Sequence, residues 1–222
     1  SRHITEIFAK IFFPLVEKSF SVDFEIPKRD MISSAKLSPL VEKLLEKHSE
    51  ANKIVCVNIN AGKICYLRRW PQENYVELIL GLYHRFGIKV VLVGGEGDVG
   101  YVNDFIMKLP KKNNIFNFCG KLSIKELVGL FTKSRLLITN DSGPLHIASI
   151  VGLPTVSFFG PETPYLYGPL GPEHHVFYED IFCSPCINIY NAKASSCNNN
   201  ICLKSIGSEI VMKTIEEKNF LT

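Results

Sequence analysis

Five short, almost fully apolar runs alternate with helical segments along the middle of the chain, and this alternation constrains the fold more than any other feature. Runs of this kind suit strands that are buried on both faces. The predicted strands cover residues 54–59, 88–93, 115–118, 135–139 and 154–159. The predicted helices between them cover residues 71–86, 98–109, 123–132 and 142–151. This order predicts an α/β protein, with a Rossmann-like parallel sheet flanked by helices.

Residues that commonly begin and end helices support these boundaries. Gly87 stands where the first of the four helices should end, and Ser123 with Glu126 forms a capping-box pattern at the start of the third. Helical spacing of apolar residues also predicts helices over residues 4–17 and 38–49, before the first strand.

Composition excludes several classes of protein. The 222 residues are 46% hydrophobic and 21% charged, which is typical of a globular protein. The net charge is only +3 and no run of five like charges occurs, so nothing indicates a nucleic-acid partner. The chain contains no stretch of about 18 apolar residues, so no transmembrane helix is predicted. The odd count of seven cysteines and the lack of a signal-peptide pattern favour the cytoplasm.

The segment most informative about function, TNDSGPLH over residues 139–146, lies where the fourth strand passes into a helix. Asp141 or Ser142 can cap this helix, and Gly143 lets a ligand approach the backbone. The positive end of the helix then forms an anion site that suits a diphosphate, to which His146 can donate a further hydrogen bond. Asp141 would repel a diphosphate, so sugar hydroxyls suit it better. An ordinary helix cap with a core histidine is the alternative.

The loop after the first strand carries two adjacent arginines, Arg68 and Arg69, just before a helix, and Asn60 precedes them. Arginine recognises phosphate oxygens through two parallel hydrogen bonds and keeps its charge. We therefore predict that Arg68, Arg69 and Asn60 contact a diphosphate donor. A solvated arginine pair is the alternative.

A glycine-rich loop over residues 94–100 follows the second strand, and a G-x-G-x-x-G spacing begins at Gly95. No acidic residue ends the next strand, which argues against a nicotinamide-dependent dehydrogenase. We predict that the loop lets a nucleotide lie close to Gly95, with Glu96 or Asp98 available to the ribose or base. Thr163, in the turn after the last strand, is a candidate contact to phosphate or sugar, although a plain loop is equally consistent.

Four cysteines cluster in a polar loop over residues 183–202, and their spacing admits a structural zinc site, disulfides or free thiols. They are Cys183, Cys186, Cys197 and Cys202.

Several of these segments resemble one family in order and spacing, over about residues 52–205. The strings NINAGKICYLRRWPQENYVELI, VVLVGGEGD, FCGKLSIKELVGLFTKSRLLITND and NDSGPLHIASIVGLPTVSFFGPETP are similar to segments of glycosyltransferase family 9. This is the family of the ADP-heptose:lipopolysaccharide heptosyltransferases. The late CSPC cluster also resembles the ending of that family.

The resemblance implies a GT-B fold, in which the C-terminal domain holds the nucleotide sugar and the active site lies between two domains. It implies an inverting, metal-independent transfer, with no catalytic cofactor, from an ADP-sugar such as ADP-heptose to a lipid-linked saccharide of lipopolysaccharide core. The protein would be peripheral to the inner membrane at most. By position, Arg68, Asp141 and His146 match the residues expected to act in catalysis. Ser142 and Gly143 match the donor motif, and Asp98 matches the acid of the nucleotide loop.

The resemblance also predicts the domain organisation. Residues 1–50 would be the end of the N-terminal acceptor domain and the linker, 51–205 the donor-binding domain, and 206–222 a C-terminal helix. The rest of the acceptor domain, with its general base, is expected before residue 1, so this chain alone is expected to be inactive. The alternatives are a non-catalytic nucleotide-sugar-binding fragment, or another GT-B enzyme such as a nucleotide-sugar epimerase.

Overall fold

The computed structural model describes residues 37–47, 54–62, 65–110, 114–191 and 194–221. They form a six-stranded parallel sheet with the strand order β3-β2-β1-β4-β5-β6. The strands are β1 (Ile54–Asn58), β2 (Lys89–Leu92), β3 (Ile115–Asn117), β4 (Leu136–Asn140), β5 (Thr155–Phe159) and β6 (His174–Tyr178). The predicted α/β fold with a Rossmann-like parallel sheet is confirmed. The helix predicted over residues 4–17 lies outside the described residues.

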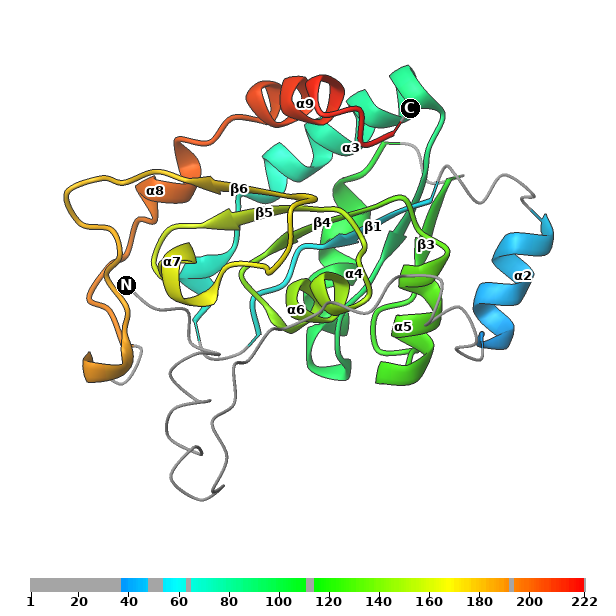
Figure 1. The fold of residues 1–222 in the computed structure, drawn as a ribbon, viewed down its shortest axis with the longest axis horizontal. Helices are drawn as coiled ribbons and strands as arrows, with labels where there is room; N and C mark the ends of the chain where they lie inside the picture. Colours follow the sequence, from blue (N-terminus) through cyan, green and yellow to red (C-terminus); the bar gives the residue numbers. More distant parts are fainter. Residues whose placement is uncertain (1–36, 48–53, 63–64, 111–113, 192–193, 222) are drawn as a thin grey trace, which may run out of the picture.

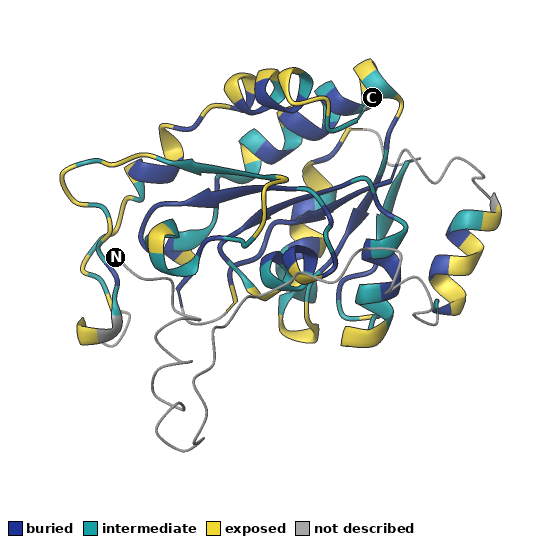
Figure 2. Cartoon of the chain, viewed as in Figure 1, coloured by how far each residue is buried: buried dark blue, intermediate teal, exposed yellow. Residues whose placement is uncertain are grey.

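The five predicted strands all form, each within two residues of its predicted ends. Every residue of β1, β4 and β5 is buried, which explains why these strands were readable as apolar runs (Figure 2). The edge strand β6 was missed, because its residues are only half-buried and its sequence begins with two histidines.

Helices cover both faces of the sheet (Figure 1). They are α2 (Pro39–Lys47), α3 (Gln72–Phe86), α4 (Val99–Lys108), α5 (Ile124–Thr132), α6 (Gly143–Ile150), α7 (Pro164–Tyr167), α8 (Ile201–Lys204) and α9 (Ser208–Glu217). Buried residues of α3, α4, α8 and α9 share one apolar cluster, and those of α2, α5 and α6 share the other.

The strands feed both clusters because successive side chains of a strand point to opposite faces. In β1, Val55 and Val57 belong to the cluster under α3, whereas Ile54 and Cys56 belong to the cluster under α5. Full burial of an aliphatic side chain stabilises the folded state by about 1.5–3 kcal/mol, so this two-sided core is the main source of stability.

The predicted helix boundaries follow from local chemistry. Gly87 ends α3 in the left-handed conformation, at φ 62° and ψ 31°, which glycine adopts without steric cost. The Ser123 hydroxyl accepts a hydrogen bond from the Glu126 amide, and the Glu126 carboxylate accepts one from the Ser123 amide at 2.8 Å. The predicted capping box is therefore confirmed.

The topology places a switch point, where the strand order reverses, between β1 and β4. The helix α3 that follows β1 covers one face of the sheet, and α6 that follows β4 covers the other. Ligands of open α/β sheets bind beyond the carboxyl ends of the strands at such a switch point. Among the helices of the described residues, none has the length and apolarity needed to span a membrane.

Candidate functional site

A buried network of polar side chains joins the carboxyl ends of β1 and β4. Asn58 Nδ2 donates to Thr139 Oγ1 at 3.0 Å and to Ser142 Oγ at 2.7 Å. Asn60 Nδ2 donates to Asn58 Oδ1 at 2.9 Å and to the Val93 carbonyl, at the end of β2, at 3.2 Å. Three loops at this edge of the sheet are thereby held in a fixed relation.

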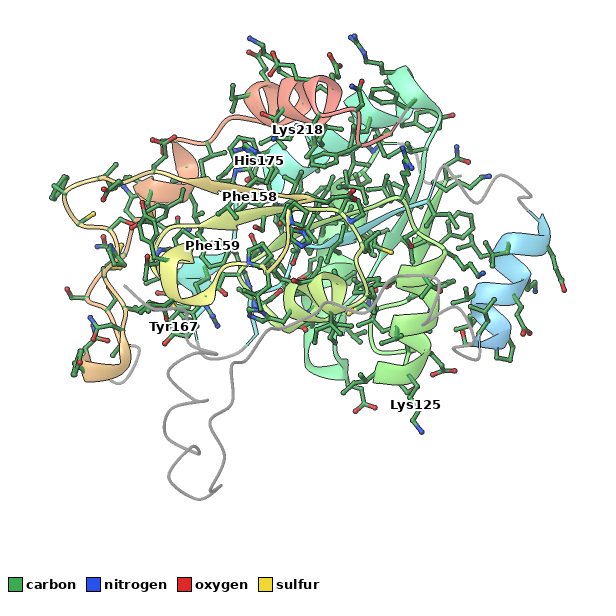
Figure 3. The ribbon with its side chains drawn as sticks, viewed as in Figure 1. Lys125, Phe158, Phe159, Tyr167, His175 and Lys218 are labelled. Carbon is green, nitrogen blue, oxygen red and sulfur yellow. The ribbon has the colours of Figure 1, made fainter. Side chains whose placement is uncertain are left out.

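Asn140, the last residue of β4, extends this network to the arginine loop. Its Oδ1 accepts hydrogen bonds from the Trp70 amide at 2.8 Å and the Tyr75 hydroxyl at 3.1 Å, and its Nδ2 donates to the Asn60 carbonyl at 3.2 Å. The Trp70 ring stacks on Phe158 with 4.1 Å between ring centroids. Figure 3 shows Phe158 on β5. Burial raises the pKa of the Tyr75 hydroxyl well above its usual value, so it stays protonated and able to donate.

The amino end of α6 faces a cavity. Ser142 is the residue that precedes the helix, but its hydroxyl turns inward to Asn58 and Thr139, and it makes no capping bond within the described part of the chain. The positive end of the helix is therefore left for another acceptor.

This cavity, here called the polar cavity, has a volume of about 340 Å³. Figure 3 shows Tyr167 on α7, one of its lining residues. The lining residues are Ala61, Gly62, Arg68, Asp141, Ser142, Gly143, His146 and Tyr167. The structure thus brings together five of the predicted site residues, from the loop after β1 and from the junction between β4 and α6. Ala61, Gly62 and Tyr167 were not predicted: Ala61 and Gly62 have no functional side-chain group, and Tyr167 lies in no motif that marks a site in sequence.

Arg68 and Asp141 form an ion pair in the wall of the polar cavity. Arg68 Nη1 lies 3.1 Å from Asp141 Oδ2, with the side chains 13% and 6% exposed. Arg68 Nη2 donates to the Ala61 carbonyl at 3.1 Å. The buried Nε of Arg68 has no hydrogen-bond partner among the described residues. The guanidinium is thus fixed in direction, with donor capacity left over.

The second arginine points elsewhere. The guanidinium carbon of Arg69 lies 3.9 Å from the ring centroid of Tyr101 on α4, which is a cation–π arrangement. Arg69 does not line the polar cavity, and Asn60 lies buried in the network beneath it at 2% exposure. The two adjacent arginines, which the sequence presents alike, therefore have different surroundings.

A second, mostly apolar cavity of about 210 Å³ adjoins the glycine loop. Its lining residues are Val93, Gly94, Gly95, Phe118, Leu122, Ser123, Ile124, Leu127, Gly143, Pro144 and Ile147. Gly143 lines both cavities, so the apolar cavity and the polar cavity meet at the amino end of α6. Apart from Gly95 and Gly143 these residues were not predicted, because apolar side chains at a cavity look like core residues in sequence.

The glycine loop approaches its neighbours closely. A Cβ on Gly94 would collide with Asn60 Nδ2 and lie 2.8 Å from Cys119 Sγ. Asp98 Oδ2 accepts a hydrogen bond from the Gly95 amide at 3.1 Å and so closes its own turn. Burial, together with the Asp98 charge, raises the pKa of Cys119 to about 11. Thr163 likewise acts locally, since its hydroxyl accepts from the Tyr165 amide at 3.3 Å and caps α7.

The four clustered cysteines are free thiols in this structure. Cys183 is exposed and Cys202 is buried. Cys186 and Cys197 pack against a small apolar cluster that contains Leu67. Burial, then the neighbouring Cys186, raises the pKa of Cys202 to about 11. Within the described ranges, no group of three or more His, Cys, Asp or Glu residues is arranged to hold a metal ion, and the structural zinc site stays a prediction.

Similarity to known proteins bears out the family resemblance. The family model described as "Glycosyltransferase family 9 (heptosyltransferase)" matches residues 5–195. The chain is 31% identical over 111 residues to lipopolysaccharide heptosyltransferase 2 of Salmonella typhimurium, a match that covers 49% of this chain and 32% of that protein. It is 27% identical over 156 residues to lipooligosaccharide heptosyltransferase 2 of Campylobacter jejuni, covering 69% and 47%.

Solved structures share the fold. A family 9 glycosyltransferase from Veillonella parvula superposes with a TM-score of 0.71 at 24% identity, covering 98% of this chain and 60% of that one. The E. coli heptosyltransferase WaaC, solved with ADP, superposes with a TM-score of 0.62 at 17% identity, covering 98% and 57%. The domain is therefore the Rossmann-like half of a GT-B fold, as predicted, and the chain spans about half the length of these relatives. With its family model matched over residues 5–195, the chain belongs to glycosyltransferase family 9.

Proposed function

We propose that this chain is the donor-binding part of a glycosyltransferase that transfers heptose from ADP-heptose to lipopolysaccharide core or a related saccharide. The observation that carries the proposal is the pair of cavities that meet at Gly143. One is apolar and the other joins a helix amino end to a fixed arginine. A nucleoside diphosphate matches this pair, because its base has flat, largely apolar ring faces and its other end is a charged diphosphate.

The base of the donor occupies the apolar cavity, between the glycine loop and α5. The diphosphate lies against the amino end of α6, where Gly143 lets it approach; Arg68 neutralises part of its charge, and His146 donates a hydrogen bond to it. Asp141 accepts hydrogen bonds from sugar hydroxyls while it holds Arg68 in place. Adenine is our choice of base because the solved WaaC structure, which shares this fold, holds ADP.

Arg69, Asp98 and Thr163 each have a local partner, and their contacts to the donor remain predictions. Asn60 acts from beneath, by holding the carboxyl ends of β1 and β2 together. Gly95 contributes to the wall of the apolar cavity.

The reaction we propose is an inverting, metal-independent transfer. An acceptor hydroxyl attacks the anomeric carbon from the face opposite the diphosphate, a base takes its proton, and ADP leaves with the electron pair of the broken bond. Arg68 and the α6 amino end stabilise the charge that develops on the leaving diphosphate. We assign the base and the contacts to a lipid-linked acceptor to the N-terminal domain of the GT-B fold. We place the whole protein in the cytoplasm.

A non-catalytic nucleotide-sugar-binding fragment and a nucleotide-sugar epimerase are the alternatives. A preference for UDP over ADP would favour the epimerase or a transferase with another sugar. Equal binding of ADP and NAD would favour a dinucleotide-binding module.

A thermal-shift titration with ADP, UDP, GDP, their sugars and NAD tests the proposal. A ligand at 100 times its dissociation constant stabilises a protein by about 2.7 kcal/mol, which is readily detected. We expect ADP and ADP-heptose to stabilise the chain most, and His146→Ala to reduce the effect. The control is His84→Ala, a histidine exposed on α3 and outside both cavities. Stabilisation by none of the nucleotides, or an equal effect of the two substitutions, would contradict the proposal.

A further inference from the structure

We propose that Asn200, in the cysteine-bearing loop, is a positioning residue that holds Arg68 in the donor site; this inference rests on the function proposed above. Asn200 Nδ2 donates to the Leu67 carbonyl at 2.8 Å and to the Arg69 carbonyl at 3.0 Å. These two carbonyls stand on either side of Arg68. One side-chain amide therefore fixes the backbone on both sides of the arginine that lines the polar cavity.

The backbone that carries Arg68 needs such support. Arg68 ends a single 3₁₀ turn (η4, Tyr66–Arg68), and the next residue, Arg69, is already extended at φ −83° and ψ 123°. One isolated turn is not stable by itself, because its nucleation costs more entropy than its hydrogen bond returns. Because the arginine side chain is long, a small tilt of this turn would displace its guanidinium by a larger distance.

The side chain of Asn200 bonds to a distant segment of the chain and not to the start of its own helix, α8. The amides of Leu203 and Lys204 donate to the Asn200 carbonyl at 2.9 and 3.1 Å, so Asn200 begins α8 through its backbone. Asparagine at such a position commonly caps the helix with its side-chain oxygen. No capping bond by the Asn200 side chain is present among the described residues.

Two further hydrogen bonds dock the same segment onto the arginine loop and α3. The Ile206 carbonyl accepts from Trp70 Nε1 at 2.8 Å and from Asn74 Nδ2 at 3.0 Å. Residues 200–206 thus contact residues 67–74 through four side-chain hydrogen bonds in all.

The segment that carries Asn200 is itself fixed to the sheet. Cys202 and Leu203 are buried, and a Cβ on Gly160, just beyond β5, would lie 2.6 Å from Cys202 Sγ and 3.2 Å from Leu203 Cγ. This close packing leaves α8 little freedom to move away from the end of β5. Asn200 therefore transmits the position of the sheet to Arg68.

A titration with ADP and adenosine separates positioning from a merely structural role. Arg68 is assigned to the diphosphate, which adenosine lacks. Asn200→Ser keeps a residue that favours a helix start but cannot reach the two carbonyls, and Asn200→Asp keeps the shape but places an acceptor against them. Asn199→Ser is the matched control, since Asn199 is exposed and pairs only with Lys204 among the side chains described.

We expect both Asn200 variants to weaken ADP binding roughly three- to tenfold, a part of what a charge-assisted hydrogen bond contributes, and to leave adenosine binding unchanged. In an Arg68→Ala background, Asn200→Ser should have no further effect on ADP. Any of three results would overturn the inference. The Asn200 variants could weaken ADP binding and adenosine binding equally, Asn200→Ser could weaken ADP binding further in the Arg68→Ala background, or both Asn200 variants could fail to fold.

The outcomes also separate this inference from the function beneath it. Failure of the unaltered chain to bind ADP would contradict the proposed function, and the inference with it. If the unaltered chain binds ADP, and Asn200→Ser binds it as tightly as Asn199→Ser does, the inference alone would be overturned.

Discussion

Replacing Arg68 by alanine should destabilise the folded chain, because the Asp141 carboxylate then stays buried without its partner. The two side chains are 13% and 6% exposed, with 3.1 Å between Nη1 and Oδ2. Removing one member of a fully buried pair costs about 3–5 kcal/mol. Since this pair lines a cavity that water can enter, we expect the free energy of unfolding to fall by about 2–3 kcal/mol.

Urea unfolding of three variants measures this effect. Arg68→Ala combined with Asp141→Asn should recover most of the loss, since asparagine needs no opposite charge. Arg69→Ala is the matched control, because it removes the same charge and, among the residues described, the side-chain contact with Tyr101, which is worth about 0.5–1 kcal/mol. The reasoning would be refuted by an Arg68→Ala chain as stable as Arg69→Ala, or by a double variant no more stable than Arg68→Ala alone.

Three further predictions concern buried and half-buried polar groups. Asn140→Leu leaves the buried Trp70 amide unpaired, and it leaves the Tyr75 hydroxyl and the Asn60 carbonyl with only their longer 3.4 Å bonds to Asn58. The free energy of unfolding in urea should therefore fall by about 2–3 kcal/mol, and a loss below about 1 kcal/mol would contradict the role of the network. Burial lowers the pKa of His174 below its usual 6.5, so the unfolded chain binds a proton at this histidine more readily than the folded chain does. The stability that neutral His174 contributes is therefore complete above pH 6.5 and is lost as the pH falls through the lowered pKa. His174→Asn should therefore flatten the fall of urea stability between about pH 7 and 5, and an unchanged slope would argue against this assignment. Because the pKa of Cys119 is raised to about 11, its thiol should react with iodoacetamide at pH 8 far more slowly than the exposed thiol of Cys183. Mass spectrometry measures both rates of alkylation, and equal rates would show that Cys119 is not buried.

The central strands were predictable because burial on both faces requires apolar residues at nearly every position. That requirement does not hold at an edge, where β6 (His174–Tyr178) is half-buried and its sequence is mixed. The position of the site followed from the same pattern, since loops at the carboxyl ends of parallel strands meet at one edge.

The residues that complete the site carry weaker signals. Arg68 and Arg69 are adjacent residues of the same type, so the sequence does not distinguish them. In the fold, Arg68 pairs with Asp141 and Arg69 lies over the ring of Tyr101. The apolar cavity is built from side chains such as Phe118, which look like ordinary core residues. Asn200 bonds to backbone carbonyls, which every residue has, so no motif pairs it with the arginine loop.

The most direct test of the account is a crystal structure of this chain with ADP. We predict the diphosphate at the amino end of α6, within hydrogen-bond distance of Arg68 and the Gly143 amide, and the adenine in the apolar cavity beside Phe118. ADP bound elsewhere on the chain, or with its diphosphate turned away from Arg68, would contradict the claim that these two cavities form the donor site.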